Sequence, residues 1–164
     1  MDEIVALYDA QGRECGSAPR SRMRAENLRH AASSIVVHDG AGRVFVHRRT
    51  TTKDVFPGLY DFAAGGVLGA GEDPDEGAAR ELAEELGIAG VGLTKLGEDD
   101  YADDHTDYHA FLYTVTWAGP VSLQAEEVSW GDWMPLPELL ERITTDPDSF
   151  VPDSVSLWRD RLGG

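Results

Sequence analysis

Residues 66–88 read GVLGAGEDPDEGAARELAEELGI, and this stretch decides the fold of the chain. Its first part is rich in glycine and predicts a loop. Residues 75 or 76 to 86 favour a helix, with Pro74 where a first helical turn accepts proline and Gly87 where a helix commonly ends. The stretch therefore predicts a glycine-rich loop that leads directly into a helix.

The predicted helix has an acidic face and an apolar face. At about 100° per residue, Glu81, Glu84 and Glu85 fall on the same side as Arg80. The opposite side carries Ala79, Leu82, Ala83 and Leu86, and we expect it to pack on a sheet. Three carboxylates so close repel one another, and a hard divalent cation such as Mg²⁺ or Mn²⁺ would turn that repulsion into attraction. A solvated acidic face without an ion is the alternative.

Length and composition indicate a globular protein with one domain over residues 1–164, and we expect residues 1–30 to form an N-terminal extension packed on the rest. The chain has 41% hydrophobic residues and a formal charge of −16. This charge disfavours binding to nucleic-acid polymers or membrane surfaces. The charge is uneven, because residues 1–53 hold nine basic and six acidic residues while most of the acids follow. The first part could therefore hold an anion and the second a cation.

Cysteine content and the first residues predict a cytoplasmic location. The single cysteine, Cys15, cannot form an internal disulfide, and residues 1–30 lack the pattern of a signal peptide. The five histidines show no zinc-site spacing with this cysteine.

The remaining pattern predicts a mixed α and β domain. We expect a hairpin of residues 33–37 and 44–46 around the Asp39-Gly40 turn, and an acidic, mobile loop over residues 98–107 near the site entrance. Further strands are expected at residues 4–8, 60–64, 93–96, 110–117 and 130–134, and further helices at residues 137–143 and 154–162.

The motif in residues 66–88 resembles the signature of the Nudix hydrolases, G-x5-E-x7-R-E-U-x-E-E-x-G-U, where U is a bulky apolar residue. All nine specified positions match: Gly66, Glu72, Arg80, Glu81, Leu82, Glu84, Glu85, Gly87 and Ile88. Residues 4–29 and 48–61 also resemble a bacterial branch related to isopentenyl-diphosphate isomerase, and residues 126–139 resemble a later region of the family that often supplies another carboxylate. The resemblance implies the α+β class, as a Nudix-type α/β/α sandwich with a mixed central β-sheet.

The resemblance further implies hydrolysis of a small-molecule diphosphate, namely a nucleoside diphosphate or one linked to another group. Water would attack phosphorus with the help of Mg²⁺ or Mn²⁺. By position in the motif, Glu84 and Glu85 are implied metal ligands, Glu81 a ligand or general base, and the Gly66 carbonyl a further ligand. Glu127 is a second possible base, and either glutamate fits that role. Arg80 would orient Glu81 or pair with Glu72, whose own role would be structural.

Substrate phosphates would meet Arg48, Arg49 and Lys53, the basic residues nearest the glycine-rich loop. Because side chains alternate along a strand, at most one of the two arginines points inward. Tyr101, Tyr108, Trp117 and Trp130 are either core residues or platforms for a nucleobase.

Two other functions stay open at this point. Isopentenyl-diphosphate isomerase activity is disfavoured, because the catalytic cysteine and histidine that the isomerases carry before the glycine-rich segment are absent from residues 61–66. A domain that senses a nucleotide without cleaving it is disfavoured because all the motif glutamates are present. The N-terminal extension is also compatible with a homodimer.

Overall fold

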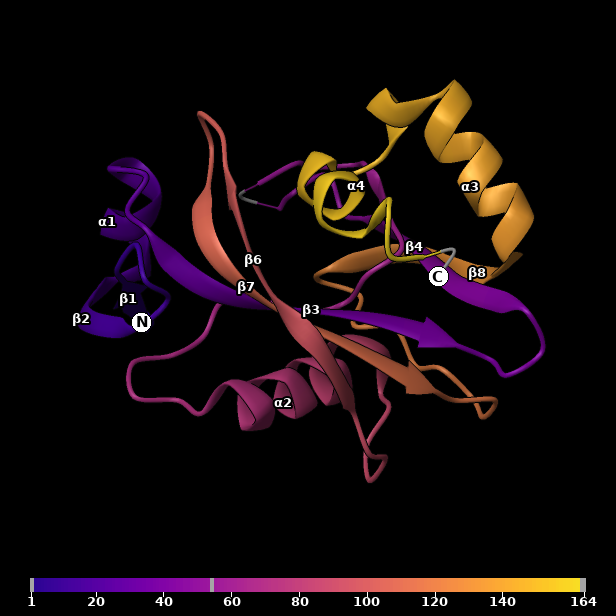
Figure 1. Ribbon diagram of the computed structural model, residues 1–164, viewed down its shortest axis with the longest axis horizontal. Helices are drawn as coiled ribbons and strands as arrows, with labels where there is room; N and C mark the ends of the chain where they lie inside the picture. The colour runs from indigo at the N-terminus through magenta and orange to yellow at the C-terminus, as the bar shows by residue number, and fades with distance from the viewer. Residues whose placement is uncertain (1, 54, 163–164) are drawn as a thin grey trace.

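Strands of one mixed sheet and helices on both of its faces form the protein (Figure 1). The computed structural model describes residues 2–53 and 55–162. In chain order the elements are β1 (Ile4–Tyr8), β2 (Glu14–Pro19), α1 (Arg20–Ala25), β3 (His30–His38), β4 (Arg43–Arg49), β5 (Tyr60–Asp61), α2 (Pro74–Leu86), β6 (Thr94–Ala102), β7 (Asp107–Thr116), β8 (Val128–Pro135), α3 (Leu136–Thr145), a 3-10 turn (Pro147–Ser149) and α4 (Pro152–Trp158). This architecture confirms the expected α+β sandwich.

The centre of the sheet is the parallel pair of β3 and β7, in register from His30↔Tyr108 to His38↔Thr116. Helix α2 covers one face, and α3 and α4 cover the other (Figure 1). Alternate side chains of β3 therefore enter two cores: Ile35 packs with Leu82 of α2, whereas Val36 packs with Leu157 of α4. Burial on both faces explains why apolar residues occupy adjacent positions in β3, as in Ala31-Ala32 and residues 35–37, instead of alternating with exposed polar ones.

The predicted hairpin of residues 33–37 and 44–46 forms only in part. Strands β3 and β4 pair only at His38↔Val44 within the described residues. β4 pairs instead with β8 in antiparallel register over its whole length, from Arg43↔Pro135 to Arg49↔Val128. The Asp39 side chain does form the expected turn, since it accepts hydrogen bonds from the backbone of Ala41 and Arg43. Long-range pairing thus overrides the local signal.

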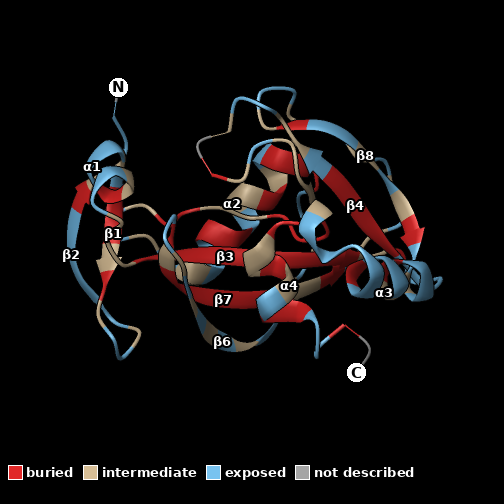
Figure 2. Cartoon of the chain, turned by 90° about the horizontal axis from the view of Figure 1, so that it is seen from above, coloured by how far each residue is buried: buried red, intermediate tan, exposed pale blue. Residues whose placement is uncertain are grey.

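The acidic segment 98–107 is not a loop, so that expectation was wrong. Residues 94–102 form β6, which pairs with β7 along its length, and the turn itself is confined to residues 103–106. The Asp103 carboxylate closes this turn by accepting from the backbone of His105 and Thr106. β6 is an edge strand and is exposed or half-buried along its length (Figure 2); Glu98 and Asp100 are exposed and Asp99 is half-buried, so burial opposes their charges little.

The sequence interpretation missed β2 and α1, and it misplaced some helix ends. β2 pairs with β1, and the Ala6 amide of β1 donates to the Leu68 carbonyl in the glycine-rich loop. Helix α4 ends at Trp158 rather than residue 162, and residues 159–162 form turns. No helix in the described part of the chain is long and apolar enough to cross a membrane.

Candidate active site

A cavity of about 480 Å³ opens between the glycine-rich loop, α2, and the adjoining ends of β3 and β4. Helix α2 positions the motif side chains on it. The Asp73 carboxylate caps the helix by accepting from the amides of Asp75 and Glu76, Pro74 occupies the first turn, and Gly87 ends it with a left-handed backbone (φ 69°). The three predicted helix glutamates, Glu81, Glu84 and Glu85, all line the cavity.

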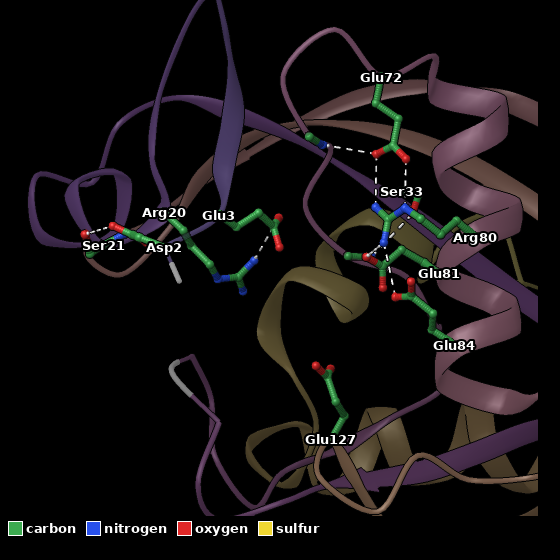
Figure 3. Close-up of polar contacts among 12 residues, drawn as sticks. Asp2, Glu3, Arg20, Ser21, Ser33, Glu72, Arg80, Glu81, Glu84 and Glu127 are labelled. Atoms are coloured by element: carbon green, nitrogen blue, oxygen red, sulfur yellow. Dashed lines mark hydrogen bonds and ion pairs between the residues drawn. The ribbon is translucent and has the colours of Figure 1, made fainter.

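Arg80 holds three carboxylates in place (Figure 3). Its Nε and Nη2 donate to Glu72 at 2.8 and 3.0 Å, while Nη1 donates to Glu81 at 2.9 Å and to Glu84 at 3.1 Å. Hydrogen bonds from Arg80 lower the pKa of Glu72, and Glu72 also accepts from the Gly69 amide. Both suggested roles of Arg80, pairing with Glu72 and contacting Glu81, are therefore present, and the helix is tied to the loop.

Gly66 lies directly against the Glu81 carboxylate. A Cβ at this position would lie 2.5 Å from Cδ of Glu81, so only glycine leaves the carboxylate its place. The Gly66 carbonyl accepts from the Ser33 amide at 3.0 Å, which leaves one lone pair for another partner. Burial raises the pKa of Glu81, and the neighbouring Arg80 opposes that shift.

Glu85 does not lie on an exposed face, in contrast to the expectation from the helical wheel. Only 5% of the residue is exposed, whereas Ala79, assigned to the apolar side, is exposed. Its Oε1 lies 3.3 Å from Nε2 of the equally buried His47 on β4. Burial raises the pKa of Glu85 to about 8 and lowers that of His47 to about 3. The sequence interpretation missed His47, because nothing local links it to the helix.

Glu127 faces the helix glutamates from the opposite side of the cavity (Figure 3). Its Oε2 accepts from Lys53 Nζ at 2.5 Å. Arg49 also lines the cavity and donates from Nε to the Val55 carbonyl. Arg48 does not line it: its guanidinium packs over the Tyr60 ring at 5.6 Å and donates to the Gly58 carbonyl. As strand alternation requires, only one of the two arginines faces the site.

Four of the other polar residues that line the cavity are linked by hydrogen bonds and are called its inner wall; the sequence predicts a polar role in the site for none of them. They are Asp61 of β5, Tyr108 of β7, and Asp153 and Ser154 at the start of α4. Tyr108 was considered only as a core or stacking residue. The other aromatic candidates, Tyr101, Trp117 and Trp130, do not line the cavity. The N-terminal extension contributes Arg20 and Arg24, which no motif indicated.

The donor set fits Mg²⁺ or Mn²⁺ in its chemistry, because four glutamates and one backbone carbonyl offer oxygen atoms to the same cavity. Over residues 2–53 and 55–162, however, no three acidic, histidine or cysteine side chains are gathered into a ready metal-binding group. Arg80 holds Glu81 and Glu84, and Lys53 holds Glu127. A metal ion would have to replace some of these ion pairs.

The arrangement of a glycine-rich loop, a glutamate-bearing helix and a mixed sheet is that of a Nudix enzyme. The family model of the NUDIX domain matches residues 28–154. The chain belongs to this family and is a Nudix pyrophosphohydrolase. It is 42% identical over 162 residues to the uncharacterized Nudix hydrolase YfcD of Escherichia coli K12, covering 97% of this chain and 88% of the relative. It is 44% identical to the uncharacterized Nudix hydrolase SCO1686 of Streptomyces coelicolor, covering 96% and 87%.

Solved structures agree with the fold. The protein DR0079 of Deinococcus radiodurans superposes with a TM-score of 0.75 at 21% identity, over 88% of this chain and 90% of that one. A MutT protein of Methanosarcina mazei gives a TM-score of 0.69 at 20% identity, over 84% and 95%. At these identities the structures support the architecture alone. The relationship to isopentenyl-diphosphate isomerase has no counterpart among these proteins.

Proposed function

We propose that this enzyme hydrolyses a diphosphate linkage in a nucleoside diphosphate, or in a nucleoside diphosphate linked to another group, with Mg²⁺ or Mn²⁺ as cofactor. The observation that carries the proposal is the pairing of opposite charges in one cavity. Glu84 and Glu85, with Glu81 as a further ligand or a base, would hold the cation, and Arg49 and Lys53 line the same cavity to meet phosphate oxygens. The coexistence of both charge types suits a polyanion bound together with a divalent cation.

The bound cation would neutralise phosphate charge and make water a better nucleophile. Glu84 and Glu85, with the Gly66 carbonyl, are the proposed ligands. Glu81 or Glu127 would accept the proton of the attacking water, since both carboxylates line the cavity and one faces the other across it. Arg80 would keep Glu81 and Glu84 oriented through its contact with Glu72. Arg48 has no part in this proposal.

The test is a panel of nucleoside diphosphates, triphosphates, sugar nucleotides, dinucleotides and isopentenyl diphosphate, assayed with Mg²⁺ or Mn²⁺ and again with a chelator. We expect cleavage of one substrate class that stops when the metal is removed. Metal-dependent binding without cleavage would favour a nucleotide sensor instead. Double-bond migration in isopentenyl diphosphate would favour an isomerase.

Replacing Glu84 with Gln removes a ligand charge and keeps the shape of the side chain. We expect turnover to fall on the order of 100-fold. Glu76→Gln is the matched control, because Glu76 lies exposed in the first turn of the same helix. Equal turnover of the two variants would overturn the role of Glu84.

The other features follow from this assignment. We propose that the partner is a small-molecule diphosphate rather than a nucleic-acid polymer or a membrane. We also propose that the enzyme works in the cytoplasm. The N-terminal extension, residues 1–30, is compatible with a homodimer. We also propose that residues 1–164 act as a single domain, to which residues 1–30 add α1 and its cavity arginines, Arg20 and Arg24.

A further inference from the structure

The inner wall of the cavity offers a ligand mainly hydrogen-bond acceptors, because the hydroxyl donors of the wall already bond to its carboxylates. Ser154 Oγ donates to Asp61 Oδ1 at 2.6 Å, and the Ala63 amide donates to the same oxygen at 3.0 Å. Tyr108 OH donates to Asp153 Oδ2 at 2.5 Å. The two carboxylates are thereby fixed in position, and the two hydroxyls that could have served a ligand as donors point to them instead.

One oxygen of this wall has no partner. Among the side-chain nitrogen and oxygen atoms that are buried in the described residues, Asp153 Oδ1 is the one without a hydrogen bond. Burying a carboxylate oxygen without a donor is unfavourable, and such atoms in folded proteins call for an explanation. Asp153 lines the cavity, so a ligand bound there lies against the residue whose Oδ1 has no donor.

The wall also lacks a direct ion-pair partner. No lysine or arginine in the described ranges makes an ion pair with Asp61 or Asp153, whereas Arg80 pairs with Glu81 and Glu84 and Lys53 pairs with Glu127. Burial raises the pKa of both wall acids, and the charge of Arg49 only partly opposes that shift. An apolar prenyl group against this wall would leave the acceptors unsatisfied. A hydroxyl would satisfy one oxygen, but an ammonium group brings several N–H donors and the missing positive charge.

We propose that Asp153, supported by Asp61, Tyr108 and Ser154, forms a subsite for an amino or ammonium group on the organic part of the substrate. This inference rests on the proposed function and extends it, because it names the chemistry of the group attached to the diphosphate. The phosphates lie at the α2 glutamates with Arg49 and Lys53, and the organic part extends to the start of α4. The cavity volume of about 480 Å³ is in the range of small-molecule sites.

The test uses cytidine diphosphate esters that differ in one terminal group: 2-aminoethyl, 2-(trimethylammonio)ethyl and 2-hydroxyethyl. We expect kcat/KM at least tenfold higher for the primary amine than for either of the others, since trimethylammonium has charge but no N–H. A second arm compares adenosine with inosine diphosphate, which places the amino group on the base. A preference for the amine in the first arm places the recognised amino group on the ester, and a preference in the second arm places it on the base. If the kcat/KM values agree within twofold in both arms, the inference is overturned.

Asp153→Asn tests the residue itself. The carboxamide keeps the size of the side chain and removes its charge, so we expect the preference for the amine to fall to about one. Asp160→Asn, at an exposed position just after α4, is the matched control and should keep the preference. A preference that survives in Asp153→Asn overturns the assignment. The series of three esters on the native enzyme decides the question if this variant does not fold.

Dissociation constants for the same ligands, measured by calorimetry with Mg²⁺, separate this inference from the proposed function. If no ligand is cleaved but the amines bind at least tenfold more tightly, the hydrolase proposal fails and the subsite stands. If the ligands are cleaved and neither kcat/KM nor the dissociation constant depends on the amine, the subsite fails and the hydrolase proposal stands.

Discussion

Arg80 and Glu72 form a bidentate ion pair that joins α2 to the glycine-rich loop, with N–O distances of 2.8 and 3.0 Å. The remaining nitrogen, Nη1, reaches Glu81 and Glu84. The planar guanidinium is suited to this geometry, because its donors lie in one plane at fixed angles. One arginine thus sets the positions of the loop and of two proposed metal or base residues at once.

Arg80→Lys should lower turnover without unfolding the protein. A lysine supplies one compact charge and cannot contact Glu72 in bidentate fashion while holding Glu81 and Glu84. Loss of such orienting contacts commonly costs about 10–100-fold in activity. Steady-state assays should show this fall, while Arg142→Lys, at the exposed pair with Glu138, should retain native activity. Native turnover in Arg80→Lys would mean that the cluster does not need its orientation.

Gly66→Ala tests the close approach of the loop to Glu81. The added Cβ would lie within 2.5–2.7 Å of the Glu81 carboxylate, so the carboxylate must move. Because it is the end of a flexible side chain, we expect the melting temperature to change little. A displacement of about 1 Å can cost about 100-fold in rate. Gly92→Ala is the control, since a Cβ there meets nothing within 4 Å. Unchanged kcat in Gly66→Ala would exclude a role for Glu81 at this position.

His47→Phe should weaken the site from β4, the strand whose His47 contacts Glu85 of α2. The substitution removes the contact of His47 Nε2 with Glu85 Oε1 and leaves a buried acid without this partner. We expect a loss of about 1–3 kcal/mol in unfolding free energy and a higher metal concentration for half-maximal activity. Denaturant melts and metal titrations measure the two effects. His47→Gln keeps a hydrogen-bond donor, so it should recover part of the unfolding free energy and part of the metal affinity. Identical behaviour of the two variants would contradict a role of His47 as the partner of Glu85.

The stability of the protein should fall in acid through the cluster around His109. Hydrogen bonding to His109 lowers the pKa of Glu98, and hydrogen bonds from Arg29 and then His109 lower that of Asp100. Carboxyls with lowered folded-state pKa values stabilise the fold above their ordinary values, 4.5 and 3.8, and this contribution is lost as the pH falls through the lower folded-state values.

His109→Gln should therefore unfold with a shallower dependence on pH below about 4.5 than the native protein, because the native contacts that lower these pKa values are weakened. Urea melts between pH 3 and pH 7 provide the measurement. Asp160→Asn, at an exposed turn position, should keep the native slope. The same slope in His109→Gln would show that this histidine does not couple the two acids to folding.

The sequence predicted the motif helix and its surroundings well, because their signals are local. Pro74 marks the start of the helix and Gly87 marks its end, and the structure places the helix ends at these residues. Features that depend on long-range packing were not predictable. Glu85 is buried because β4 brings His47 to it, and β6 is a strand because β7 offers it an edge. Asp61 and Asp153 lie far apart in sequence, and only the docking of α4 joins them.

We propose that water attacks phosphorus of the substrate in a metal-dependent step. The most direct measurement is to hydrolyse the substrate that the panel identifies in ¹⁸O-labelled water with Mg²⁺ or Mn²⁺. The products are then analysed by ³¹P NMR and mass spectrometry. We predict that one ¹⁸O atom appears on a phosphate product, and that a chelator abolishes both the label and the cleavage. Label in an alcohol product, or cleavage that continues in the chelator, would contradict the account.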